Sequence, residues 1–128
     1  MLCAVVSDPY TYLEELGPAL AEAQRRGEAL LVVFFISPRT LARLARDLGE
    51  KGWLGPASLK ALEASMRAGY RLLAEDVLAD IAERAGALGV QVETSVFEGD
   101  LDDLLLQLNE RGCSKVFGVE VLSRAETR

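Results

Sequence analysis

The stretch ALLVVFFI, residues Ala29–Ile36, decides the fold, because it contains no polar side chain. An apolar run of eight residues that is rich in β-branched and aromatic side chains is typical of a β-strand. Because apolar and polar positions do not alternate in this run, both faces of the strand are expected to be buried. Strands of this kind occur in parallel sheets that carry helices on both faces.

The residues before this stretch predict a second strand and a helix. Leu2 to Val6 is a short apolar run that ends at Ser7-Asp8-Pro9, which indicates a buried strand followed by a loop. From Thr11 to Arg26 apolar residues recur every three or four positions and predict an amphipathic helix. Gly27 is expected to end that helix, since glycine readily adopts the left-handed conformation that follows many helices.

Two helices and a glycine-rich connection are expected after Ser37-Pro38. Arg39 to Leu48 has the spacing of a short amphipathic helix, and Gly49 to Pro56 is the most loop-like stretch of the chain. Ala57 to Ala85 carries the strongest helical periodicity in the sequence. The short helix is expected to gather Leu41, Leu44 and Leu48 on one face and to leave Arg39, Arg43 and Arg46 in solvent.

The last third of the chain predicts strand, helix and strand. Apolar and polar residues alternate from Val90 to Val96, which indicates a half-exposed strand at the edge of the sheet. A helix is expected from Leu101 to the residue before Gly112, with Asp100 as its N-cap. Lys115 to Leu122 is the expected fourth strand, and a polar tail follows it.

The resulting order of elements is β-α-β-α-α-β-α-β, and it predicts the fold class. Alternating strands and helices favour right-handed parallel crossovers. We therefore expect a single domain over residues 1–128, built as a three-layer α/β/α sandwich around a doubly wound parallel sheet of four or five strands. A length of 128 residues fits one domain.

Composition excludes several classes of function. The chain has 14 Lys and Arg against 20 Asp and Glu, so its net charge of -6 argues against a nucleic-acid partner. It has no histidine, which removes the usual general base near neutral pH and the commonest metal ligand. The longest apolar run is far shorter than a bilayer-spanning helix, and no basic segment precedes the first strand. A cytoplasmic protein without a membrane partner is expected.

The two cysteines, Cys3 and Cys113, lie beside apolar strand residues. We expect buried free thiols in a reducing compartment that serve as small core side chains. If the strands that begin near Cys3 and after Cys113 are neighbours, the two thiols lie close together at one end of the sheet. A redox or metal-binding pair is the alternative.

Any ligand site is expected outside the carboxyl ends of the strands, where sheets of this class bind ligands. This rim carries carboxylates and no lysine, so a phosphate would be repelled unless a metal ion or backbone N–H groups intervened. The residues expected there are Ser7, Asp8, Pro9, Ile36, Ser37, Glu98, Gly99, Asp100 and Glu120.

Known catalytic motifs do not occur at this rim. The sequence has no G-x-x-x-x-G-K-[ST] loop, no G-x-G-x-x-G after the first strand, no C-x-x-C and no G-x-S-x-G. Asp8, Glu98 and Asp100 could supply oxygen ligands for Mg²⁺ in a hydrolase. The favoured interpretation is structural: Asp100 caps a helix, Asp8 opens a turn and Glu98 is solvated. No catalytic residue and no metal ligand is therefore assigned.

The layout of residues 1–119 resembles the universal stress protein family. Residues 1–37, MLCAVVSDPYTYLEELGPALAEAQRRGEALLVVFFIS, resemble its opening strand, helix, glycine and second strand. Residues 90–119, VQVETSVFEGDLDDLLLQLNERGCSKVFGV, resemble its third strand, glycine-containing turn, helix, glycine and fourth strand. The resemblance implies an adenine-nucleotide alpha-hydrolase-like fold and a non-catalytic, homodimeric module of the stress response or of regulation.

Two departures from the family pattern concern the nucleotide and the dimer. The ATP-binding branch has a glycine-rich loop after its fourth strand, whereas Gly118 is the last glycine here. The resemblance carries over only Ser7 and Asp8, as ribose contacts, so no cofactor is expected and an adenine-nucleotide sensor (ATP) remains the alternative. The family's fifth strand is missing or reduced to a remnant in Val119 to Leu122. An exposed fourth strand invites pairing, so we expect a homodimer that uses this strand or the tail.

Trp53 is the candidate anchor for a protein partner. It is the only tryptophan, and it lies in the glycine-rich connection after the arginine-bearing helix. Large aromatic side chains on loops often anchor partners. The alternative is that Trp53 folds back as a small core beneath its own loop.

Overall fold

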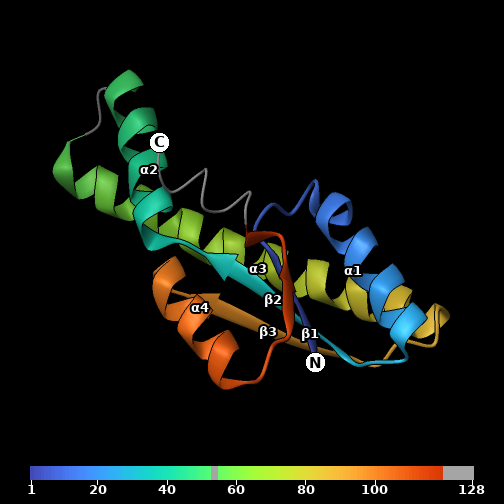
Figure 1. The fold of residues 1–128 in the computed structure, drawn as a ribbon. Helices are drawn as coiled ribbons and strands as arrows, with labels where there is room; N and C mark the ends of the chain where they lie inside the picture. The colour runs from blue at the N-terminus through green and yellow to red at the C-terminus, as the bar shows by residue number, and fades with distance from the viewer. Residues whose placement is uncertain (53–54, 120–128) are drawn as a thin grey trace.

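A computed structural model describes residues 1–52 and 55–119 of the chain (Figure 1). In order, its elements are β1 (Leu2–Val6), α1 (Tyr12–Arg26), β2 (Leu30–Ile36), α2 (Pro38–Lys51), α3 (Pro56–Ala87), β3 (Val92–Glu98), α4 (Leu101–Glu110) and β4 (Lys115–Phe117).

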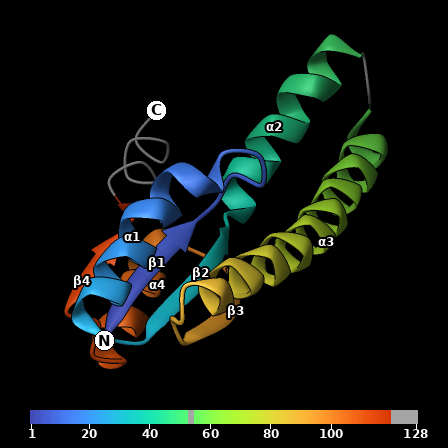
Figure 2. The same cartoon turned by 90° about the vertical axis from the view of Figure 1, so that its right-hand side faces the viewer.

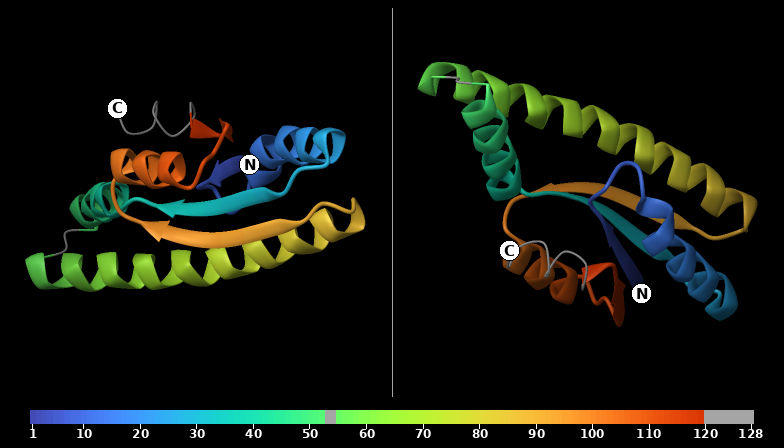
Figure 3. Two further views of the ribbon diagram at one scale, coloured as in Figure 1. Left: turned by 60° about the horizontal axis from the view of Figure 1, so that its bottom comes forward. Right: turned by 90° about the horizontal axis from the view of Figure 1, so that it is seen from above.

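The four strands form one parallel sheet with the order β3-β2-β1-β4. The helices α1 and α3 pack on one face of this sheet, and α4 packs on the other face. Figure 3 shows α3 and α4 on opposite sides of the strands. The predicted three-layer α/β/α sandwich with a parallel sheet is confirmed, with four strands among the described residues.

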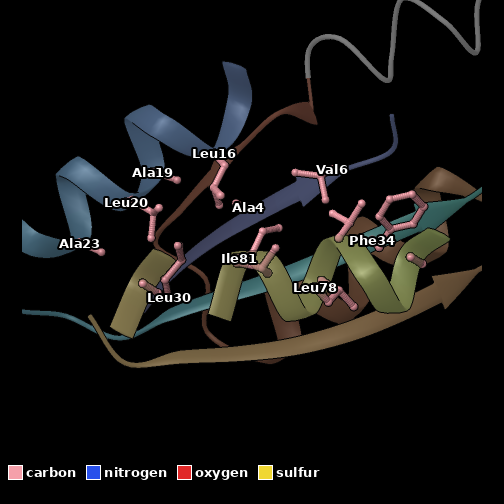
Figure 4. Close-up of a cluster of buried hydrophobic side chains, with 14 of the residues drawn as sticks. Ala4, Val6, Leu16, Ala19, Leu20, Ala23, Leu30, Phe34, Leu78 and Ile81 are labelled. Atoms are coloured by element: carbon pink, nitrogen blue, oxygen red, sulfur yellow. The ribbon is translucent and has the colours of Figure 1, made fainter. Parts of the chain in front are cut away.

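The core is built around β1 and β2, in which every residue is buried. Their side chains alternate between the two faces of the sheet. The residues Ala4, Val6 and Phe34 face α1 and α3, where Figure 4 shows them beside side chains from both helices. Val5 and Phe35 belong to the second cluster, under α4. Residues 30–36 of the apolar stretch therefore have the two-sided burial that its composition predicts, whereas Ala29 is exposed.

Both edge strands agree with the sequence in position, and one of them differs in length. β3 is an edge strand with an exposed middle, as the alternation predicts. β4 is the other edge strand and ends at Phe117. The strand predicted to reach Leu122 is therefore too long, because residues 118 and 119 are not part of it. Residues 120–122 lie outside the described residues. The chain leaves β4 at Gly118, where φ is 88° and an added Cβ would lie 2.1 Å from the carbonyl oxygen of Val5. Only glycine fits this close approach of β4 to β1.

The helix α2 and the first part of α3 extend beyond the carboxyl ends of the strands (Figure 2). The helix α2 continues through Gly49 to Lys51 and is longer than the predicted Arg39 to Leu48. The buried residues of α3 lie only in its second half, where it covers the sheet. We call α2 and residues 56–66 of α3 the hairpin.

The expectation of two free thiols is wrong, because Cys3 and Cys113 form a disulfide. Their Cα atoms lie 5.8 Å apart, a separation that is typical of disulfides. β1 and β4 are neighbours, as this proximity requires, and Cys113 precedes β4 by two residues. The bond ties the buried strand β1 to the short edge strand β4.

We predict that breaking this disulfide lowers the free energy of unfolding by about 4 to 5 kcal/mol, because the bond closes a loop of 110 residues and so restricts the unfolded chain. Urea unfolding of the oxidised and reduced protein measures the difference. A Cys3→Ala/Cys113→Ala variant is the control, and reductant should leave its unfolding midpoint unchanged. Equal midpoints for oxidised and reduced wild type, or two alkylatable thiols in the unreduced unfolded chain, would contradict the prediction.

Candidate functional site

The carboxyl edge of the sheet holds the candidate site. β2 and β3 follow β1 on one side, whereas β4 lies on its other side, so the strand order reverses between β1 and β4. Ligands of doubly wound sheets bind at this kind of reversal. The loop after β1, with Ser7 and Asp8, lies at this point, and Gly118 follows β4 there.

Asp8 opens a turn, as predicted. The backbone N–H of Tyr10 donates a hydrogen bond of 2.8 Å to Oδ1 of Asp8. The Asp8 side chain is exposed, and Ser7 is partly buried. The two candidate ribose contacts are therefore adjacent at the strand reversal, but one carboxylate oxygen of Asp8 already holds the local backbone.

Ser37 serves as the N-cap of α2. Its Oγ accepts a hydrogen bond of 3.2 Å from the backbone N–H of Thr40, and Pro38 occupies the first helical position. Ser37 is 9% exposed. The Ser37 hydroxyl accepts from a backbone N–H of the first helical turn that would otherwise lack a partner, so it already serves a structural role.

Glu98, at the carboxyl end of β3, is bound by two arginines of α3, which corrects the expectation that it is solvated. Nε of Arg67 lies 2.8 Å from one carboxylate oxygen. Nε of Arg71 donates a hydrogen bond of 3.1 Å to the other oxygen, and Nη2 of Arg71 donates to that oxygen as well. The Glu98 side chain is 19% exposed. The rim therefore contains basic side chains after all, supplied by a helix rather than by a loop.

An open pocket of about 300 Å³ lies beside this cluster and is lined by Arg71, Glu75, Val96 and Glu98. Its charged groups include the Arg71–Glu98 pair, so a ligand there would compete with an existing ion pair. A second pocket, of about 360 Å³, lies at the amino edge of the sheet between the α1–β2 and α3–β3 turns, and Glu28 is among its lining residues. That edge is opposite to the one at which parallel sheets bind ligands.

Asp100 occupies the predicted N-cap position of α4, but its side chain makes no capping hydrogen bond. Among residues 1–52 and 55–119, no group of three or more His, Cys, Asp or Glu side chains could hold a metal ion. Asp8, Glu98 and Asp100 therefore do not assemble as the Mg²⁺ ligand set that a hydrolase would need.

Glu15 is a site residue that the sequence reasoning missed. Burial raises the pKa of its carboxyl above the ordinary value, and the charges of Asp8 and Glu14 raise it further. Its Oε2 is buried without a hydrogen-bond partner. One feature of the sequence could have indicated Glu15: it lies near Asp8 and Glu14 in a segment that has no Lys or Arg before Arg25.

Two residues named from the sequence, Trp53 and Glu120, lie outside the described residues. Of the three arginines expected in solvent, Arg39 and Arg46 are exposed and Arg43 is partly buried. The leucines expected to share a buried face diverge: Leu41 is 2% exposed, whereas Leu44 and Leu48 are 39% and 53% exposed.

We predict that raising the pH above 4.5, the ordinary pKa of a glutamate, destabilises the protein through Glu15. Between that value and its raised folded-state pKa, folded Glu15 keeps a proton that the unfolded chain has released, so stability falls with rising pH. The variant Glu15→Gln should lack this fall and should be more stable than wild type near neutral pH. Urea unfolding across this range tests it, with Glu83→Gln, at an exposed position, as the control. Identical pH profiles for Glu15→Gln and wild type would refute it.

Comparison with known proteins gives no assignment. No helix within the described ranges is long and apolar enough to cross a bilayer. The chain matches no model of a known protein family, and no curated protein matches it.

Proposed function

We propose that the chain is a non-catalytic, universal-stress-protein-like module that acts in stress response or regulation through protein contacts. The observation that carries this proposal is that three polar side chains of the rim are used within the fold. Asp8 holds the Tyr10 backbone, Ser37 caps α2, and Glu98 pairs with Arg67 and Arg71. A ligand would have to displace these partners, and the buried Ser37 hydroxyl would lose its hydrogen bond at a cost of about 1–3 kcal/mol.

The surface of the hairpin supports contact with a protein. Leu44 and Leu48 are exposed on α2, in an element that extends beyond the sheet. Exposed apolar side chains that gather on one element often mark an interaction surface. Trp53, which we propose as a partner anchor, joins α2 to α3 in the sequence.

A homodimer is part of the proposal. The sheet has two open edges among the described residues, and unpaired strand edges favour association. β4 offers only three residues for pairing, so pairing through that strand alone would be weak. We therefore propose a homodimer in which either the fourth strand or the C-terminal tail takes part.

A cytoplasmic location also belongs to the proposal. The disulfide between Cys3 and Cys113 then has to be compatible with a reducing compartment. Disulfides are rare in reducing compartments, where those that form are usually transient or redox-sensing. In the cytoplasm Cys3 and Cys113 would be thiols at rest. They would join when an oxidised disulfide of another molecule accepts their two electrons and two protons, which fits a stress-responsive module.

An adenine-nucleotide sensor is the second candidate, because Ser7 and Asp8 lie at the strand reversal. We predict that ATP, ADP, AMP and cyclic AMP leave the melting temperature unchanged in differential scanning fluorimetry. A ligand that binds only the folded state raises this temperature by mass action. A saturating rise of several degrees that Ser7→Ala/Asp8→Ala abolishes would instead establish the sensor.

The protein-contact proposal predicts self-association at high micromolar concentration. Sedimentation equilibrium should give a species of twice the 13.9 kDa mass of one chain. A mass of 13.9 kDa over the whole concentration range would count against the homodimer.

A further inference from the structure

The two cysteines of the disulfide differ in their access to solvent. Cys3 lies in β1, an inner strand of the sheet that pairs with β2 on one side and with β4 on the other. It is 0% exposed. Cys113 lies in the connection from α4 to β4 and is only partly buried. A reagent in solution can therefore approach Cys113 while the fold is intact, whereas Cys3 becomes accessible only when the sheet opens.

Apolar side chains from three elements enclose Cys3. Its register partners are Leu31 of β2 and Val116 of β4, and Leu104 and Leu108 of α4 belong to the same buried cluster. A cavity of about 40 Å³ under α4 is lined by Leu31, Leu104 and Leu108 and does not reach Cys3. Because protein interiors are close-packed, a reagent would have to displace β4 or α4 to contact this sulfur.

Hydrogen bonds hold the two cysteines side by side independently of the disulfide. The backbone N–H of Ser114 donates a hydrogen bond of 2.9 Å to the carbonyl oxygen of Met1, and Oγ of Ser114 donates to the same oxygen at 3.2 Å. The backbone N–H of Cys113 donates a hydrogen bond of 3.1 Å to the carbonyl oxygen of Leu108. Figure 1 shows the N-terminus beside this connection. The two thiols are therefore expected to remain neighbours after reduction, and reacting groups held close together react as if highly concentrated.

We propose that Cys113 is a site of thiol–disulfide exchange with low-molecular-weight disulfides, and that Cys3 is the buried thiol that resolves the mixed disulfide formed there. The inference rests on the stress-responsive module proposed above and assigns the chemistry of its response to one sulfur. The exchange site lies at the amino edge of the sheet, where β1 and β4 begin. It is thus separate from the carboxyl edge that carries Ser7 and Asp8.

The exchange consists of two balanced steps. In the first, Cys113 loses its proton and its Sγ attacks one sulfur of the external disulfide, so that a mixed disulfide forms and the external S–S bond breaks. The leaving thiolate takes up a proton. In the second, Cys3 loses its proton and its Sγ attacks Sγ of Cys113, which forms the Cys3–Cys113 bond and releases the second external thiol. Two cysteine thiols are oxidised, and one external disulfide is reduced to two thiols. Reduction follows the same steps in reverse, so an external thiol also attacks at Cys113.

Single-cysteine variants test which sulfur reacts first. Each reduced variant is mixed with glutathione disulfide, with and without urea, and formation of the mixed disulfide is followed by mass spectrometry. Cys3→Ala, which keeps Cys113, should react while folded. Cys113→Ala, which keeps Cys3, should react about a hundredfold or more slowly while folded, because reaction at the buried thiol requires the sheet to open. The urea samples are the control for intrinsic reactivity, and there the two variants should react at similar rates.

Wild type supplies a test that needs no substitution in the core. Reduced, folded wild type treated with a limiting amount of iodoacetamide should be alkylated on Cys113, as located by peptide mapping. With glutathione disulfide it should end as the intramolecular disulfide and release two molecules of glutathione per chain. Equal folded-state rates for the two variants, or alkylation of Cys3 first, would overturn Cys113 as the site. A mixed disulfide that persists on Cys113 of wild type would overturn the role of Cys3.

The outcomes separate this inference from the function on which it rests. If Cys113 reacts first but glutathione at a cytoplasmic ratio of thiol to disulfide leaves the Cys3–Cys113 bond intact, the exchange site stands and the resting dithiol state in the cytoplasm is wrong. If neither thiol of the reduced protein reacts while folded, the exchange site is wrong, whereas a homodimeric module that contacts other proteins stands.

Discussion

The burial of β1 and β2 on both faces is the constraint on which the rest of the structure depends. All twelve residues of these strands are buried, so an apolar cover is needed on each side of the sheet. The crossovers from β1 to β2 and from β2 to β3 supply α1 and α3 to one face. The other face is covered by α4, which leads back to the far side of β1. The strand reversal at Ser7 and Asp8 is a consequence of covering both faces.

The strand β4, which brings the chain back beside β1, is short, and strand pairing is not the only interaction that holds it there. β4 pairs with β1 over only three residues. The disulfide between Cys3 and Cys113 fixes the start of this pairing, and Gly118 allows the end of β4 to approach the Val5 carbonyl oxygen. Because an isolated three-residue strand has few hydrogen bonds with which to offset its ordering entropy, the covalent bond sets the position of this edge.

The elements could be predicted from the sequence because their signals are local, whereas the missed contacts join distant residues. Apolar periodicity located the strands and helices, and the alternation from Val90 to Val96 identified an edge. The pairing of Glu98 with Arg71 crosses 27 residues, and no local pattern reports which helix face passes the end of a strand. The continuation of α2 through Gly49 was missed because Gly49 is buried in the tertiary structure, which overrides the low helix propensity of glycine.

The net charge of a chain describes how it interacts with a partner at long range, whereas contacts are made at short range. At distances beyond about 8–10 Å physiological salt screens exposed charges, so a partner in contact meets the local charge rather than the average of -6. Glu98 shows the same effect within the chain: two arginines from α3 pair with this carboxylate, although its sequence neighbourhood contains only acidic charges.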